Sequence, residues 1–265
     1  MLRRVGLGWA VSAIGRRFGS RLSRFEVEID GLRLGGDRVG HLYYARELVA
    51  DRREDYFREL FIKSIRPGAT VLEGGPYIGY LTINAAAAVG ERGRVVAVEP
   101  NPETLNALRE NVARNGFDAR VDVVEAALGA KPSRSSFHLT EGGDTSSLHS
   151  PEYPSRIVEV DVVRGDDLLD RADVVKLDLE GNETAALRGL RRLITDSRPT
   201  LFCECNAAML ESAGSSVAEL RRELESLSYD VRWIDESART LRPFDDAQGS
   251  EYVNLRASPA EGVRR

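Results

Sequence analysis

The stretch Val174–Leu190, VVKLDLEGNETAALRGL, joins a hydrophobic strand to an acidic turn and a helix. Val174–Leu177 is a short apolar run of the kind that forms a fully buried strand in a parallel sheet. Asp178 and Glu180 follow it, and Glu183–Ile194 has the pattern of a helix. A buried strand does not need two carboxylates at its end, because burying an unpaired charge costs several kcal/mol. We therefore expect these acids to serve a site at the edge of the sheet.

Strands and helices alternate on both sides of this stretch. The predicted strands are Thr70–Leu72, Arg94–Val98, Val121–Val124, Val174–Leu177 and Thr200–Cys205. The predicted helices are Glu54–Ile65, Tyr80–Val89, Pro102–Asn115, Glu183–Ile194 and Val217–Leu227. This alternation predicts an α/β fold with a doubly wound, Rossmann-like sheet whose strands are mostly parallel. Two later runs, Tyr229–Ile234 and Tyr252–Arg256, have no helix between them and predict an antiparallel hairpin at one edge.

The predicted domain organisation is one α/β domain, residues 54–265, preceded by an extension, residues 1–53. From Arg24 to about Arg53, the short apolar alternations FEVEID, LRLGG and HLYYAREL predict a small β element. Residues 131–166 are polar, rich in Ser and strand-like, which predicts an insertion. His138 and His149 in this insertion flank a Gly-Asp-Ser run, which is either a solvated turn or a loop that closes over a substrate.

The composition is that of a globular protein, with 42% hydrophobic and 30% charged residues among 265. A formal net charge of −5 argues against a nucleic-acid partner, since such proteins normally carry a basic field. Cys203 and Cys205 are expected to be free, buried thiols, because a disulfide between residues two apart in a strand is strained. These features predict a cytoplasmic protein.

The first 24 residues are basic, with six arginines and no acid before Glu26. Their apolar run Val5–Gly15 is too short to span a bilayer. Three interpretations remain open: a helix docked on the domain, an amphipathic helix on an anionic membrane surface, and a secretion signal. The second would give the protein a peripheral membrane contact through residues 1–24.

A glycine-rich turn, EGGPYIG at residues 73–79, follows the first strand of the predicted sheet. Glycines there allow the backbone to approach a ligand at a helix N-terminus. The next strand ends at Glu99, which is placed to accept hydrogen bonds from ribose hydroxyls. This pair fits a nicotinamide or an adenosyl cofactor. Glu73 and the lack of GxGxxG spacing favour the adenosyl cofactor, because a carboxylate repels a pyrophosphate and attracts a sulfonium or amino group.

Three motifs together resemble the FkbM family of S-adenosylmethionine-dependent methyltransferases. VLEGGPYIGYLT (residues 71–82) is similar to the family's first-strand motif, VLDVGANIGYFT. VVAVEPNPETLNALRENVARNG (residues 95–116) is similar to its second strand and helix, and VVKLDLEGNETAALRGL looks like its KIDVEG-x-E motif. The resemblance covers about Arg66 to Asn206, and it implies a class I methyltransferase fold with S-adenosylmethionine as cofactor.

The resemblance also implies roles for residues near the glycine turn. The expected cofactor-binding residues are Glu73, Gly75, Tyr77, Gly79, Glu99, Asn101, Glu125 and Ala126. Of these, Glu73, Gly75 and Gly79 would face the methionine part. Glu99 would face the ribose, and Glu125 and Ala126 the adenine edge. Pro76-Tyr77 stands where the family usually has Ala-Asn, so an altered pocket or a catalytically inactive binding module remains an alternative.

The expected catalytic residues are Asp178, Glu180 and Glu204, at the tips of the two strands beyond the cofactor half. An alcohol acceptor loses a proton when it is methylated, so a positioned carboxylate is expected beside it. Lys176 lies on the same face of its strand as Asp178 and is expected to pair with it. The three acids could also hold Mg²⁺, but no metal site is part of the prediction.

Each acid also has a structural interpretation. Asp178 could cap the following helix or form an ion pair, and Glu180 and Glu183 lie where a helix dipole favours an acid. Glu204 could accept hydrogen bonds from a neighbouring loop. The resemblance implies an O-methyltransferase acting on a hydroxyl of a sugar, glycolipid or polyketide-type metabolite. An NAD(P)-dependent oxidoreductase on the same fold is the alternative.

Overall fold

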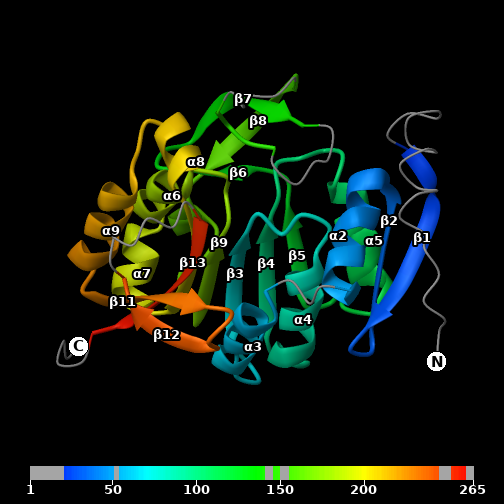
Figure 1. Ribbon diagram of the computed structural model, residues 1–265, viewed down its shortest axis with the longest axis horizontal. Coiled ribbons are helices and arrows are strands. Elements are labelled where there is room, and N and C mark those ends of the chain that lie inside the picture. Colours follow the sequence, from blue (N-terminus) through cyan, green and yellow to red (C-terminus); the bar gives the residue numbers. More distant parts are fainter. Residues whose placement is uncertain (1–20, 51–53, 141–145, 150–154, 245–251, 261–265) are drawn as a thin grey trace.

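The computed structural model describes residues 21–50, 54–140, 146–149, 155–244 and 252–260. The strands of its main sheet are Thr70–Gly74 (β3), Arg94–Val98 (β4), Val121–Val124 (β5), Val174–Leu177 (β9), Thr200–Asn206 (β10), Tyr229–Asp235 (β11), Thr240–Pro243 (β12) and Tyr252–Pro259 (β13). These eight strands run in the order β12-β11-β13-β10-β9-β3-β4-β5 (Figure 1). The strands from β10 to β5 are mutually parallel, and β13, β11 and β12 pair antiparallel. The prediction of a mostly parallel sheet is confirmed.

Helices cover both faces of this sheet. They are Asp55–Ser64 (α3), Tyr80–Val89 (α4), Leu105–Arg114 (α5), Glu183–Gly189 (α6), Arg191–Ser197 (α7), Ala207–Ser212 (α8) and Val217–Ser226 (α9), with a 3-10 turn at Gly165–Asp167. Neighbouring strand residues face opposite layers, as the strand period of two requires. Val71 packs with α3, α4 and α5, whereas Leu72 packs with α6, α7 and α9. The sheet is therefore doubly wound.

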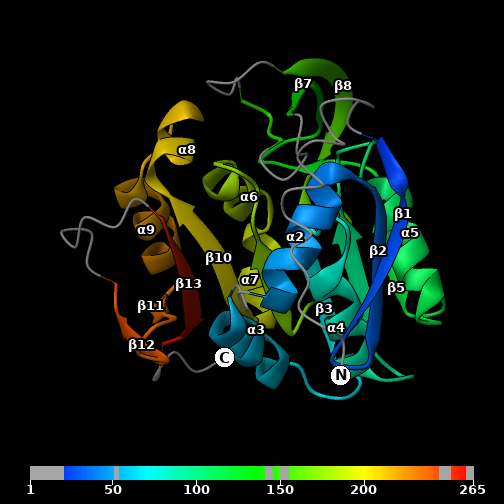
Figure 2. The same cartoon turned by 45° about the vertical axis from the view of Figure 1, so that its right-hand side comes forward.

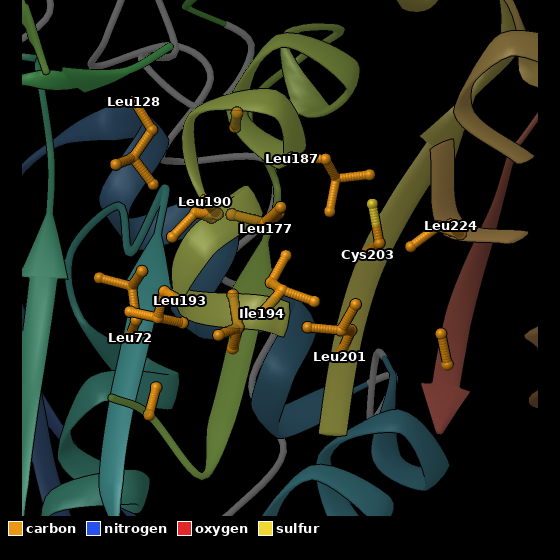
Figure 3. Close-up of a cluster of buried hydrophobic side chains, with 14 of the residues drawn as sticks. Leu72, Leu128, Leu177, Leu187, Leu190, Leu193, Ile194, Leu201, Cys203 and Leu224 are labelled. Atoms are coloured by element: carbon orange, nitrogen blue, oxygen red, sulfur yellow. The ribbon is translucent and has the colours of Figure 1, made fainter. Parts of the chain in front are cut away.

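The layer on the α6–α7 side is built mainly from leucine. Figure 3 shows the buried side chains Leu72, Leu177, Leu187, Leu190, Leu193, Ile194, Leu201 and Cys203. Full burial of one such leucine stabilises the fold by roughly 1.5–3 kcal/mol. Because this packing holds β3, β9 and β10 in place, it fixes the strand ends that carry the predicted site.

The strand order reverses between β3 and β9. From β3 the chain winds outward through β4 and β5, and it returns to β9 and β10 on the other side. Leu72 is paired with Val175, and Gly74 with Leu177, so these two central strands end level with each other. In doubly wound sheets, ligands bind in the crevice outside the carboxyl ends at this switch point.

The antiparallel edge has three strands instead of a two-stranded hairpin. β11 and β13 do pair, but β12 forms the outermost hairpin with β11, and β13 lies between β11 and β10 (Figure 2). In this position β13 covers the edge of β10, and its residues Leu255 and Ala257 are buried. Cys203 and Cys205 of β10 are buried, free thiols, as predicted.

The predicted helix Glu183–Ile194 is two helices, because the chain bends at Leu190 between α6 and α7. Gly189 approaches the backbone of Gly129 so closely that a Cβ atom would lie 2.0 Å from the Gly129 carbonyl oxygen. The short helix α8 was not predicted. It begins at Asn206, whose side chain accepts a hydrogen bond from the backbone N–H of Met209.

The N-terminal extension is a hairpin followed by a helix. β1 (Arg21–Ile29) and β2 (Leu32–Arg38) pair antiparallel, and Val39–Ala50 forms helix α2. The β interpretation of HLYYAREL, residues 41–48, was wrong. This segment lies inside α2, where His41 and Ala45 are buried one helical turn apart. The helix presents them to the domain at a spacing of four residues.

Asn111 of α5 and Asn115, the residue that follows this helix, attach the extension to the domain. The Asn111 side chain accepts a hydrogen bond from the Gly35 N–H (2.8 Å) and donates to the Gly35 carbonyl (3.0 Å). It also donates to the carbonyl of Ile78 in the glycine turn (2.7 Å). Asn115 bonds the N–H and carbonyl of Arg33 in the same way. The extension is thereby bonded to the turn that the sequence assigns to the cofactor.

Residues 127–163 contain a second, smaller sheet. Its strands are Ala127–Leu128 (β6), Ser133–Leu139 (β7) and Arg156–Val163 (β8), in the order β6-β8-β7. Figure 1 shows β7 and β8 above the end of the main sheet where the parallel strands finish. The predicted insertion is therefore strand-like in its described part, and it lies on the side of the predicted site.

The predictions for residues 1–20 lie outside the described residues, and with them most of the proposed membrane contact. Among the residues that the structure describes, no helix combines the length and hydrophobicity needed to cross a membrane.

Candidate active site

A pocket lies at the carboxyl ends of β3, β4, β9 and β10. Part of its wall comes from the small sheet and from α2. Its described lining includes six acidic residues, Glu54, Glu73, Glu99, Asp178, Glu180 and Glu204, and one basic residue, Lys176. This excess of carboxylates gives the pocket a negative field.

The glycine turn approaches the end of β9 so closely that only glycine fits at Gly75. Its φ is +72°, and a Cβ atom there would lie 1.8 Å from the Asp178 carbonyl oxygen. Gly79, with φ +88°, precedes the first residue of α4. Lys176 donates a hydrogen bond from Nζ to the Gly75 carbonyl (2.9 Å). The turn is therefore held against the strand that carries the predicted catalytic acids.

Tyr77 has the left-handed backbone conformation, with φ +53°, which is uncommon for a bulky residue. Its N–H donates to Glu99 Oε2 (3.0 Å). Its ring meets the rings of His41 and Tyr44 edge to face, with centroids 5.4 and 5.2 Å away. Helix α2 of the extension thus supports the residue that departs from the family's Ala-Asn pattern.

Glu99 binds the backbone of its surroundings with both carboxylate oxygens. Besides the Tyr77 bond, Oε1 accepts a hydrogen bond from the Asn101 N–H (2.8 Å). Burial raises the pKa of Glu99 to about 7, against the opposing effect of these two donors. Glu99 also lines the pocket. Its contact with a ribose stays a prediction.

Glu73 is fully buried at the end of β3. Thr82 donates from its hydroxyl to Glu73 Oε2 (2.7 Å), while Oε1 has no hydrogen-bond partner. Burial raises the pKa of Glu73, and the nearby charge of Lys176 opposes this rise. The unsatisfied oxygen of a buried acid is a favourable place for a ligand's ammonium group.

Lys176 links the two halves of the pocket. It is 4% exposed, and its Nζ lies 3.1 Å from Asp178 Oδ2. Burial alone would lower its pKa, but the charges of Asp178 and Glu73 outweigh burial and raise it. The predicted pairing of Lys176 with Asp178 is confirmed, and Lys176 is charged between two acids.

Asp178, Glu180 and Glu204 lie together on the wall formed by β9 and β10. One carboxylate oxygen of each lies within 4.8 Å of the other two. Glu180 has φ +52°, and Glu204 is 6% exposed. Burial, together with the charges of Asp178 and Glu180, raises the pKa of Glu204 well above its usual value. The sequence placed these acids at neighbouring strand tips, and the structure brings them into one group.

Glu183 serves the backbone instead of the pocket. Its Oε1 accepts hydrogen bonds from the N–H groups of Leu179 (2.7 Å) and Gly181 (3.3 Å), and it begins helix α6. This agrees with its interpretation as an acid in the first turn of a helix. Asn182, and not Asp178, precedes the first residue of that helix.

Several predicted cofactor residues lie outside the described pocket lining. Glu125 points to Arg109 (3.2 Å), and Ala126 is packed in the core on the α6–α7 side. Gly79 contributes its backbone, whereas Asn101 donates its N–H to Glu99 and accepts the Glu103 N–H at its side-chain oxygen (2.9 Å). Ala127 and Leu128, just beyond Ala126, line the pocket instead.

Three polar lining residues, Glu54, Tyr252 and Asn254, are among those that were not predicted. Glu54 precedes α3, and its Oε1 accepts hydrogen bonds from the Tyr252 hydroxyl (2.6 Å) and from Asn254 Nδ2 (2.9 Å). All three residues line the pocket. No local sequence signal points to them, because they meet only when β13 inserts beside β10.

The small sheet and the described residues between β7 and β8 supply part of the pocket wall. Ser146 and Leu148 line the pocket, and His149 Nε2 lies 3.4 Å from Asn182 Oδ1. His138 Nδ1 lies 3.1 Å from Ser155 Oγ, away from the pocket lining. Neither histidine is placed at the group of three acids, so the described geometry favours the structural interpretation of both.

The sheet order, the glycine turn at the switch point and the acid-lined pocket define a class I methyltransferase fold. The family model for the methyltransferase FkbM domain matches residues 73–231, which is more than half of the chain. The chain belongs to the FkbM family of S-adenosylmethionine-dependent methyltransferases. The predictions of family, fold class and methyl donor are confirmed.

Similar proteins agree with this fold. A protein-L-isoaspartate O-methyltransferase of Triticum aestivum is 37% identical over 112 residues, which are 38% of this chain and 45% of that protein. The match spans less than half the length of each curated relative that we compared. Two solved structures share the fold: a protein of Clostridium thermocellum described as a candidate rRNA methylase, and TYW2 of M. jannaschii in complex with AdoMet.

The first of these structures has 11% identity and a TM-score of 0.51, and covers 78% of this chain and 94% of its own. The second has 15% identity and a TM-score of 0.50, and covers 89% of this chain and 86% of its own. At these identities the likeness concerns the fold alone.

The residues at the switch point fit S-adenosylmethionine. The unsatisfied Oε1 of Glu73 is an acceptor suited to the ammonium of the methionine part. Gly75 allows the backbone to come close to a ligand, and the acidic pocket favours a sulfonium cation. The sequence left open a nicotinamide or an adenosyl cofactor. These acids repel the pyrophosphate of a nicotinamide cofactor, and they therefore favour the adenosyl cofactor.

Proposed function

We propose that this chain is an O-methyltransferase that transfers a methyl group from S-adenosylmethionine to a hydroxyl of a sugar, a glycolipid or a polyketide-type metabolite. The observation that carries the proposal is the pocket itself. On one side it has the family's glycine turn with Glu73 and Glu99, and on the other side the grouped acids of β9 and β10. A methyl donor and a proton acceptor can therefore be held face to face.

The cofactor half binds and orients the donor. Glu73 is placed to accept a hydrogen bond from the ammonium group, and Glu99 fixes the turn through Tyr77 and Asn101. S-adenosylmethionine, when bound, supplies an electrophilic methyl group on sulfur. Methyl transfer is an in-line displacement, and much of its rate comes from holding the two reacting atoms close and aligned.

The acceptor half orients a hydroxyl and removes its proton. Lys176 holds Oδ2 of Asp178, which fixes this carboxylate beside the glycine turn. Asp178 is the base nearest to the cofactor half, and Glu180 and Glu204 lie within reach to orient the acceptor. The partly exposed side chain of Asp178 keeps its access to a ligand.

The charge of the pocket supports an uncharged acceptor. The described lining has six carboxylates and a single lysine, which is already paired with Asp178. A phosphate or carboxylate on the acceptor would be repelled by this wall. A sugar or polyketide hydroxyl carries no such penalty.

The proposal is tested by incubating the full chain with methyl-labelled S-adenosylmethionine and panels of glycosides, glycolipid extracts and macrolide aglycones. The expected product is a methylated acceptor with release of S-adenosylhomocysteine. Treatment with base separates the classes, because methyl esters release methanol whereas methyl ethers keep the label. We expect the product to keep the label after treatment with base. We also expect the label not to be removed as an N-methyl group.

Asp178→Asn is the matched variant, since it keeps the shape and removes the base. We expect at least a hundredfold loss of kcat with little change in S-adenosylhomocysteine binding, in line with typical contributions of roughly 10²–10⁴ from general-base catalysis. Full activity of this variant would contradict the role of Asp178. A label that base releases would show that the acceptor group is a carboxylate and not a hydroxyl. Binding of S-adenosylhomocysteine without transfer to any acceptor class would favour the inactive binding module.

A further inference from the structure

The acids of the β9–β10 wall are close enough to share one ion. One oxygen of each of Asp178, Glu180 and Glu204 lies within 4.8 Å of the others. Oxygen ligands lie at about 2.0–2.1 Å from Mg²⁺ and about 2.3–2.6 Å from Ca²⁺. Two ligands of one ion are therefore separated by at most roughly 4–5 Å. The spacing of the three oxygens lies near this limit.

Glu204 is the member of the group that the protein leaves unsatisfied. Its side chain is 6% exposed, and its buried Oε2 has no hydrogen-bond partner. The nearest buried cation, Lys176, donates instead to Gly75 and Asp178. Leaving a buried carboxylate oxygen without a partner costs several kcal/mol, so this atom is expected to have a ligand in the working protein.

The backbone holds the acidic turn in a fixed position. Glu180 and Gly181 both have positive φ, +52° and +101°. A Cβ atom at Gly181 would lie 2.3 Å from the carbonyl oxygen of Met209 in α8. The turn is thus pressed between the end of β9 and α8, and Glu180 is presented to Glu204. A residue with this backbone conformation is strained, and such strain is typical of ligand sites.

We propose that Asp178, Glu180 and Glu204 form a binding site for a divalent cation that prefers oxygen ligands, of the Mg²⁺ or Mn²⁺ type. Carboxylates with no nitrogen or sulfur donor in the group select such hard cations. Water and hydroxyl oxygens of the acceptor fill the other coordination positions. The ion neutralises the negative charge of this wall that Lys176 does not compensate.

Binding of the ion does not depend on the proposed function, but its effect on the acceptor hydroxyl does. An ion at this wall attracts the oxygen of an acceptor hydroxyl and lowers its pKa, so that the hydroxyl loses its proton more readily. It also selects acceptors with two neighbouring hydroxyls, which can both bind one ion. Methyl transfer then depends on the ion, whereas binding of S-adenosylmethionine does not.

The direct test is titration of the full chain with Mn²⁺, followed by electron paramagnetic resonance and by calorimetry, with and without S-adenosylhomocysteine. We expect one saturable site, displaced by Mg²⁺. Glu204→Gln and Asp178→Asn should each weaken Mn²⁺ binding at least tenfold. Glu91→Gln is the matched control, because Glu91 is exposed in the turn between α4 and β4, far in the sequence from this wall. It should bind Mn²⁺ as the unmodified chain does.

Thermal unfolding shows whether the variants are folded and gives a second readout. Mg²⁺ should raise the melting temperature of the unmodified chain and of Glu91→Gln, but not of Glu204→Gln, since an ion that binds only the folded state stabilises it. Absence of saturable binding up to about 10 mM Mn²⁺, well beyond the range of weak protein sites, would overturn the proposal. Unchanged affinity in a folded Glu204→Gln variant would do the same. Methyl transfer without ion binding would contradict this inference but not the proposed function. Ion binding without methyl transfer would contradict the proposed function but not this inference.

Discussion

The two halves of the pocket treat their carboxylates differently. On the cofactor half, Glu99 accepts two backbone hydrogen bonds and Glu73 accepts one from Thr82. On the acceptor half, Glu204 and its neighbours are close to one another, and Oε2 of Glu204 has no partner. Glu99 of the first half holds the protein's own turn with both oxygens, whereas Glu204 of the second half keeps one oxygen for a ligand, as Glu73 does for the ammonium group. Glu99 and Glu204 are therefore the same residue type at two strand ends, one fixed by its own backbone and the other open to a ligand.

The largest expected effect comes from removing the cation that lies between the halves. Lys176→Met keeps the length of the side chain but leaves Glu73 and Asp178 without their positive partner. Breaking a buried pair in this way should lower the free energy of unfolding by about 4 kcal/mol. The measurement is urea unfolding at pH 7.

Lys63→Met is the control for this variant. Lys63 is exposed and pairs with Glu59 along α3, so its loss should cost less than about 1 kcal/mol. Equal effects of the two variants would mean that Lys176 does not connect the two halves.

The second effect is an acid sensitivity of the cofactor half. His41, packed against Tyr77, is fully buried, and burial lowers its pKa from 6.5 to about 4, modulated by the nearby charges of Asp37, Arg38 and Glu103. Between these pH values the unfolded chain binds a proton that the folded chain does not. Stability should therefore fall as pH drops from 6.5 to 4, by roughly 3 kcal/mol in total.

His41→Phe keeps the ring and removes the titration. The difference in unfolding free energy between this variant and the unmodified chain should grow by that amount as the pH is lowered. A difference that is constant from pH 7 to pH 4 would show that His41 takes up no proton on unfolding.

The third effect concerns Glu99 itself. Glu99→Ala leaves the N–H groups of Tyr77 and Asn101 without their acceptor, which should lower the free energy of unfolding by about 2 kcal/mol. Binding of S-adenosylhomocysteine should weaken as well, because the turn loses its anchor. Calorimetry and urea unfolding measure the two quantities. Glu125→Ala, which loses only an exposed contact with Arg109, should change stability by less than about 0.5 kcal/mol.

The smallest effect has the opposite sign. Glu204→Gln relieves repulsion among the grouped acids, so without added metal it should raise the free energy of unfolding by up to about 1 kcal/mol. Loss of a carboxylate would thus destabilise the cofactor half and stabilise the acceptor half. A clear loss of stability in metal-free Glu204→Gln would show that the carboxylates of the two halves do not differ in this way.

Much of this site was readable because strand ends in a parallel sheet share one edge. Residues 73–79, Glu99 and Asp178 were each assigned to a strand tip, and those tips meet at the switch point. The grouping of Glu180 with Glu204 needed the register of β9 and β10, which pairs Leu177 with Cys203. Sequence pattern gives the existence of a strand more reliably than its register with a neighbour.

Other parts were not readable, for physical reasons that differ from place to place. The segment that became α2 is short and has apolar residues on several sides, so its alternation imitates a strand. β13 was expected in an edge hairpin, but it inserts beside β10 because this buried strand needs a partner for its backbone. Tyr252 and Asn254 of β13 reach the pocket only through that insertion, and there they contact Glu54.

The sequence by itself determined the α/β class, the strand ends that carry the acids and the family, because hydrophobic period and short motifs are local properties of the chain. Tertiary structure alone decided which acid has a partner. Glu99 and Glu204 are both buried glutamates at strand ends, and only the surrounding backbone donors distinguish them. That distinction depends in part on residues far apart in the sequence, such as Tyr77 and Glu99, and it separates a carboxylate that holds the fold from one that awaits a ligand.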